Sequence, residues 1–132
     1  MAATGAVRVP VLKTARSMRR TMEESLDARA QAFLREHGTM TVATIGPEGP
    51  WSAAVFYVND GLDLIWLSKP GARHSVNLAA DPRASITIQE DFRRPGPVKG
   101  IQMEGSVEGP TIPAAAARIM GLYLEKFPPA DM

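Results

Sequence analysis

Short segments of β-prone and alternating apolar and polar residues follow one another through the middle of the chain. Alternation is clearest after residue 82, where Ala84, Ile86 and Ile88 share one face and polar residues share the other. A period of two residues is typical of a strand with one buried face. Pro-Gly and Asn-Asp-Gly turns separate the earlier segments. The pattern predicts strands over residues 40–45, 51–58, 62–68, 83–89 and 99–108.

Apolar residues at helical spacing predict three helices, over residues 22–37, 73–80 and 113–126. We expect a tight turn at Asn59-Asp60-Gly61, and a bulge or a close backbone approach at Gly105, which interrupts the last strand. Hairpins and alternating strands favour an antiparallel sheet that curls into a small barrel. With 132 residues the chain has room for one core.

Charge divides the chain unevenly. Residues 1–20 hold five of the 15 basic residues and none of the 14 acidic ones. We expect a flexible basic arm over residues 1–20 and a domain over residues 21–132. A strap across a partner subunit, a transit peptide and a nucleic-acid contact are alternatives for the arm, and a net charge of +1 favours no nucleic-acid partner.

Cysteine is absent, which excludes disulfides and thiolate metal sites and suits a cytoplasmic protein. No apolar run approaches the roughly 20 residues that span a bilayer, so we expect no membrane partner. Only His37 and His74 could offer imidazole ligands, and their separation predicts no metal site. No serine has an evident base, so an enzyme of this sequence would depend on a bound cofactor.

The most informative segment follows the apolar run Leu62 to Leu67. The chain there passes through Ser68 and a Pro-Gly turn into a short helix that begins at Arg73 and His74. Hydroxyl, guanidinium and helix N–H groups together can bind a phosphate. The same residues equally fit a solvated turn, with Ser68 ending the strand. Of the two tryptophans, we expect Trp66 in the core and Trp51 at a ligand or an interface.

The ordered series of segments resembles the pyridoxamine 5′-phosphate oxidase-like family of FMN-binding split barrels. The likeness extends over about residues 22–126, and no single motif decides it. It rests on residues 33–44, 49–57, 64–68, 73–85 and 100–105. The resemblance implies a six-stranded antiparallel split β-barrel with flanking helices, which is a mainly β (α+β) fold. It also implies a homodimer with two flavin sites at the subunit interface.

The resemblance further implies residues around the flavin ring. The second predicted strand would lie along the isoalloxazine ring, and Gln102 matches a glutamine that approaches the flavin from the partner subunit. The strand residues nearest the ring would be Ser52, Ala53, Ala54 and Val55.

At the other end of the cofactor, Leu67 and Ser68 would reach the ribityl phosphate region. Arg73 and His74 stand where the family places two basic phosphate ligands. His74 replaces a frequent lysine, which would make phosphate binding weaker or dependent on pH.

Two departures from the pattern of the pyridoxamine 5′-phosphate oxidases argue against oxidation of vitamin B6. The sequence has no Arg-x-His signature before Met132, and the second strand has small or apolar residues where a basic residue is expected. The resemblance therefore implies an FMN-dependent oxidoreductase acting on an unknown small substrate or electron donor. A non-catalytic flavin or haem binder, a deazaflavin-dependent reductase, and a structural dimer with an empty site are the alternatives.

Overall fold

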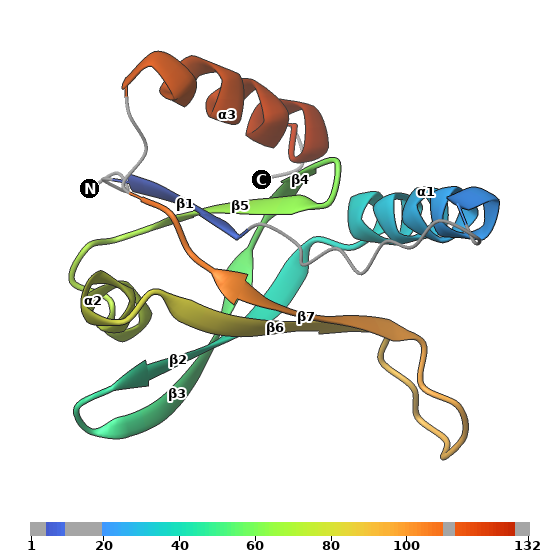
Figure 1. Ribbon diagram of the computed structural model, residues 1–132, viewed down its shortest axis with the longest axis horizontal. Helices are drawn as coiled ribbons and strands as arrows, with labels where there is room; N and C mark the ends of the chain where they lie inside the picture. The colour runs from blue at the N-terminus through green and yellow to red at the C-terminus, as the bar shows by residue number, and fades with distance from the viewer. Residues whose placement is uncertain (1–4, 10–19, 110–112, 129–132) are drawn as a thin grey trace.

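Two antiparallel sheets form the body of the molecule in the computed structural model (Figure 1), which describes residues 5–9, 20–109 and 113–128. One sheet has the strand order β1-β5-β4, and the other has the order β3-β2-β6-β7. The strands of the first sheet are β1 (Gly5–Val9), β4 (Val58–Asp60) and β5 (Asp63–Ser68). Those of the second are β2 (Thr39–Gly46), β3 (Gly49–Phe56), β6 (Arg83–Gln89) and β7 (Gly100–Ser106).

The main core lies between the two sheets because the strands turn alternate residues toward it. On β5, Leu64 and Trp66 are fully buried within this core, whereas Ile65 packs in a second cluster with α3. Burial on both faces explains why this strand has a nearly continuous apolar sequence. Trp66 is a core residue, as the sequence predicts.

Three helices flank the sheets (Figure 1). They are α1 (Arg20–Glu36), α2 (Arg73–Ala80) and α3 (Pro113–Lys126). In Figure 1, α3 covers the outer face of the β1-β5-β4 sheet, and Ile119 anchors it against Val58 and Ile65. α2 lies beside the β2–β3 hairpin, and the exposed loop between β6 and β7 projects away from the body.

The fold is the α+β split-barrel type that the sequence predicts, with differences in detail. The expected second strand divides at Tyr57 into β3 and β4. The expected tight hairpin turn is present, but it lies later in the chain than Asn59-Asp60-Gly61. Asn59 and Asp60 belong to β4, and the pairing of Asp60 with Asp63 leaves Gly61 and Leu62 as the loop. Gly61 has a φ of 62°, which suits glycine at this turn.

Of the two alternatives for Gly105, the bulge was wrong, since β6 and β7 pair without interruption from Arg83 with Ser106 to Gln89 with Gly100. A close backbone approach at Gly105 stays a prediction. β1 is a strand that the sequence pattern did not indicate, and it pairs with β5. It lies within residues 1–20, where a flexible arm was predicted. The rest of that segment, apart from Arg20, lies outside the described residues.

Candidate functional site

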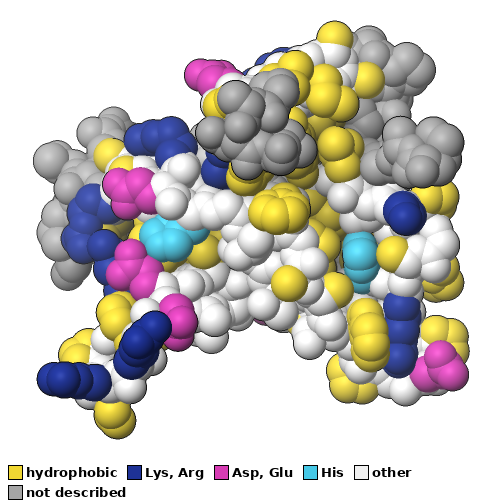
Figure 2. All heavy atoms as spheres, turned by 180° about the vertical axis from the view of Figure 1, so that it is seen from behind, with side chains coloured by type: hydrophobic (Ala, Val, Ile, Leu, Met, Phe, Trp, Pro, Cys, Tyr) yellow, Lys and Arg dark blue, Asp and Glu magenta, His cyan; other side chains and the backbone are white. Residues whose placement is uncertain are grey.

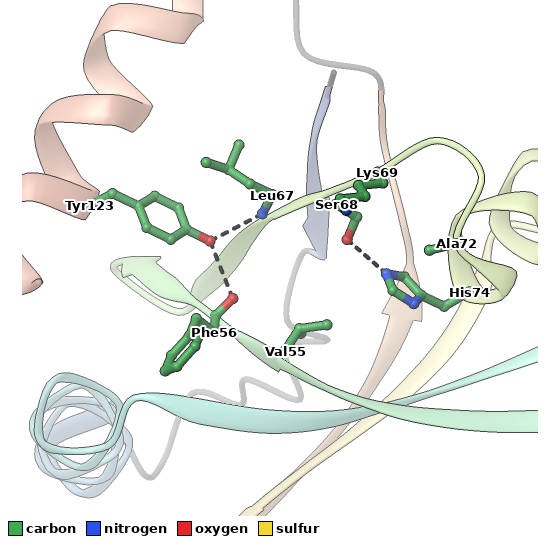
Figure 3. A pocket seen from close by; sticks show the side chains of 8 residues that line it. All are labelled: Val55, Phe56, Leu67, Ser68, Lys69, Ala72, His74 and Tyr123. Carbon is green, nitrogen blue, oxygen red and sulfur yellow. Dashed lines mark hydrogen bonds between the residues drawn. The ribbon is translucent and has the colours of Figure 1, made fainter. Parts of the chain in front are cut away.

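A cavity of about 450 Å³ opens where the ends of β3 and β5 approach the start of α2 (Figure 3). Its walls are mostly apolar; Ser68 and His74 lie on the side of α2, and the Tyr123 hydroxyl lies on the opposite side. Such a combination of an apolar body and a few convergent polar groups is typical of a small-molecule site. The lining residues are Val55, Phe56, Leu67, Ser68, Lys69, Ala72, His74 and Tyr123.

Ser68 and His74 contact each other across this cavity (Figure 3). The Ser68 Oγ and the His74 Nε2 are 2.7 Å apart, which is a hydrogen bond between the end of β5 and the first turn of α2. Burial lowers the pKa of His74, so the neutral imidazole is favoured near pH 7. This hydroxyl–base pair is not evident in the sequence, because the two residues meet only after the chain turns at Pro70 and Gly71.

The start of α2 has unsatisfied donors. Ala72 provides no side-chain cap, and the first turn contains no acidic residue. The Val76 N–H donates a helical hydrogen bond to the Ala72 carbonyl oxygen at 3.0 Å. The N–H groups of residues 73–75 come before this bond and therefore have no acceptor within the helix. Free N–H groups and the positive end of the helix dipole suit an anion.

Arg73, the first residue of α2, lies over an aromatic ring. Its Cζ is 4.2 Å from the centroid of the Trp51 ring, which is a cation–π contact. Among the described residues, no carboxylate forms an ion pair with Arg73. The guanidinium therefore retains its hydrogen-bond donors for a ligand.

Tyr123 closes the opposite side of the cavity and comes from α3 (Figure 3). Its hydroxyl accepts a hydrogen bond from the Leu67 N–H at 3.1 Å and lies 3.2 Å from the Phe56 carbonyl oxygen. Burial raises the pKa of Tyr123 to about 12, so the phenol stays protonated and can donate to a carbonyl. Tyr123 thus ties β5 to the end of β3.

The structure brings together four of the nine predicted site residues in this one cavity, namely Val55, Leu67, Ser68 and His74. Arg73 lies at the adjoining helix start. The remaining four lie outside the cavity lining: Ser52, Ala53 and Ala54 on β3, and Gln102, which is exposed on β7. Their contact with a ligand stays a prediction. Tyr123 and Phe56 were missed because only the folded chain brings α3 and the end of β3 to this cavity.

The two histidines do not form a metal site. Figure 2 shows their imidazoles on opposite sides of one face of the molecule. The His37 ring stacks on Phe33 with centroids 4.0 Å apart, and its Nε2 lies 3.3 Å from a Glu90 carboxylate oxygen. In the part of the chain that the structure describes, no group of three or more His, Cys, Asp or Glu residues could hold a metal ion. None of the helices described there is long and apolar enough to cross a membrane.

Residues 26–127 match the family model of pyridoxamine 5′-phosphate oxidase, and the chain therefore belongs to this family. A search of curated proteins found no match. Among solved structures, the chain is similar to the conserved hypothetical protein Rv2991 from Mycobacterium tuberculosis, with 34% identity and a TM-score of 0.66. That match covers 76% of this chain and 63% of the other.

A second similar structure is a heme binding protein from Mycobacterium smegmatis, with 31% identity and a TM-score of 0.61 over 76% of this chain and 41% of that one. The chain thus spans less than two thirds of the length of both proteins. An FAD-binding protein, mll6688 from Mesorhizobium loti, is 20% identical with a TM-score of 0.61, over 75% of this chain and 74% of that one, and shows the fold alone.

Proposed function

We propose that the protein binds FMN, with the phosphate at the start of α2 and the flavin ring toward β3. The observation that carries this proposal is the cavity that ends at an uncapped, acid-free helix start. The side chain of Ser68 adds a hydroxyl there. Arg73 does not line the cavity but begins the same helix, and it would supply a guanidinium to the phosphate. Arg binds phosphate through two parallel hydrogen bonds, which makes it the strongest single contributor.

The apolar part of the same cavity supports the other half of the proposal. Val55 and Leu67 offer the kind of surface against which a flat ring system packs. Lys69 is exposed beside them and would add positive charge near a phosphate. Apolar contacts for a ring and donors for a phosphate therefore lie in one continuous space.

We further propose that the protein is an oxidoreductase that acts on a small substrate other than vitamin B6. When bound, FMN supplies hydride and electron transfer, which the side chains present cannot perform by themselves. The protein contributes binding, orientation and exclusion of water. The small residues of β3, Ser52, Ala53 and Ala54, offer no positive charge to the phosphate of a B6 vitamer.

A homodimer with the flavin at the interface is part of the proposal. β3 carries exposed aromatic side chains on both faces: Trp51, on the face of Ala53 and Val55, is 40% exposed, and Phe56, on the opposite face, is 63% exposed. Exposed aromatic side chains next to a cavity are typical of surfaces that a partner covers. Gln102 would then reach the flavin bound mainly by the partner subunit.

Haem binding is the second candidate, because a relative with 31% identity is a heme binding protein. His74 is a largely neutral imidazole on a mostly apolar cavity, which suits an axial ligand. Its Nε2, however, already contacts Ser68 at 2.7 Å and would have to leave that hydrogen bond. The α2 donors are better explained by a phosphate.

The absorbance spectrum of the purified protein tests these candidates. FMN binding predicts flavin bands, either as isolated or after addition of FMN and removal of the excess. A Soret band after addition of haem, without uptake of FMN, would support the second candidate. A protein that retains neither compound would contradict both.

A further inference from the structure

Among the described residues, Arg73 forms a cation–π contact with Trp51 and no ion pair, and Trp51 lines no part of the cavity. The two residues come from different elements, β3 and α2. A surface arginine without a partner samples many rotamers, and ordering such a side chain costs free energy. A ring placed under the guanidinium limits that freedom before any ligand arrives.

Two further contacts hold the ring and the helix together. In the β2–β3 hairpin, Trp51 pairs with Thr44. The Thr44 Oγ1 accepts a hydrogen bond from the Asn77 Nδ2 at 3.0 Å, and both side chains are buried. Asn77 follows Arg73 by four residues, so the two lie on the same side of α2. The hairpin therefore contacts this side of α2 twice, through Trp51 and through Thr44.

The chemistry of the pair leaves Arg73 available. A cation–π contact engages the face of the ring and occupies none of the five guanidinium N–H donors in a hydrogen bond. A carboxylate in the same place would occupy two of them and cancel the charge. An aromatic support thus orders an arginine without competing with an anionic ligand.

We infer that Trp51 is a positioning residue, which holds Arg73 toward the flavin phosphate and thereby makes the site prefer FMN over riboflavin. This inference rests on the proposed function. It assigns Trp51 to recognition of the phosphorylated end of the cofactor. The flavin ring itself has no part in it.

Titrations with FMN and with riboflavin, followed by flavin fluorescence, test the inference. Trp51→Leu keeps an apolar side chain but removes the ring, and we expect FMN affinity to fall roughly three- to tenfold. Riboflavin has no phosphate, so its affinity should stay at the wild-type value. Trp51→Phe keeps a ring and should recover most of the loss. In an Arg73→Ala background, Trp51→Leu should have no further effect on FMN.

Ile45→Ala is the matched control. Ile45 is an exposed apolar residue of the same hairpin, and its pairing with Pro50 puts it on the opposite face from Trp51. It should change neither affinity. An unchanged FMN affinity in Trp51→Leu, or an equal loss for FMN and riboflavin, would overturn the inference while leaving FMN binding intact. A wild-type protein that binds neither flavin would instead remove the proposed function, and the inference with it.

Discussion

Gly46→Ala is expected to destabilise the protein because Gly46 lies against a buried asparagine. A Cβ at residue 46 would be 2.0 Å from the Asn77 Oδ1 and 2.6 Å from its Cγ, so Asn77 has to move. Asn77 is 3% exposed and Thr44 is 1% exposed, and their hydrogen bond would be lost on that movement. At positions with room for a methyl group, exchanging glycine for alanine usually stabilises a protein slightly, because it lowers the conformational entropy of the unfolded chain.

The magnitude follows from these contacts. A buried polar group that loses its partner costs about 1–3 kcal/mol, and crowding in a packed region costs about as much again. Subtracting the alanine gain of about 0.4–1 kcal/mol leaves a net loss of about 1–6 kcal/mol in the free energy of unfolding. In an Asn77→Ala background the clash is absent, so the same substitution should cost less than about 0.5 kcal/mol.

Urea denaturation at equilibrium, monitored by tryptophan fluorescence, measures all four members of this double-mutant cycle. Gly71→Ala is the control, because nothing lies within 4 Å of a Cβ built at Gly71. It should leave the free energy of unfolding within about 0.5 kcal/mol of wild type. A loss for Gly46→Ala no larger than that for Gly71→Ala, or a loss that persists after Asn77 is replaced, would show that contact with Asn77 does not cause the destabilisation.

Three further predictions concern single side chains of the site and its support. Burial lowers the pKa of His74 in the free protein, and a bound phosphate should raise that pKa because it favours the imidazolium. FMN affinity should therefore fall roughly three- to tenfold as the pH rises from below the pKa of free His74 to above the pKa of FMN-bound His74. His74→Gln, titrated over the same pH range, should lose this dependence; an identical profile would exclude His74 as a phosphate contact. Tyr123→Phe leaves the Leu67 N–H without its acceptor and should lower the free energy of unfolding by about 1–2 kcal/mol. Tyr57→Phe removes a 2.8 Å bond to the Leu34 carbonyl oxygen, which keeps a second donor, so thermal denaturation should show a smaller loss, about 1 kcal/mol.

Strands and helices with a strong period could be predicted from the sequence. The limits of β6 and α2 agree with the prediction because Pro82 and the Pro-Gly turn mark their starts. The division between β3 and β4 was not predicted. It falls at Tyr57, whose N–H bonds to the Gly38 carbonyl oxygen and whose hydroxyl bonds to the Leu34 carbonyl oxygen, both far away in sequence. Long-range contacts of this kind leave no periodic signal.

Some contacts of the candidate site could likewise be predicted from the sequence, and others could not. Ser68 and His74 lie at the two ends of one short loop, so sequence alone could place both near a common ligand. The contact between Arg73 and Trp51 depends on how α2 packs against the β2–β3 hairpin, and the position of Tyr123 depends on how α3 docks. The sequence indicated that Trp51 lies at a ligand or an interface. Its contact with the Arg73 guanidinium could be identified only from the fold.

One comparison of affinities tests whether the start of α2 binds a flavin phosphate. The ratio of riboflavin to FMN dissociation constants should be measured by titration for the wild type and for Arg73→Ala. The wild type should prefer FMN, and the substitution should weaken FMN binding by about 1–3 kcal/mol while riboflavin binding stays unchanged. Equal affinity of the wild type for the two flavins, or an FMN affinity that survives the loss of Arg73, would contradict binding of the phosphate at this helix start.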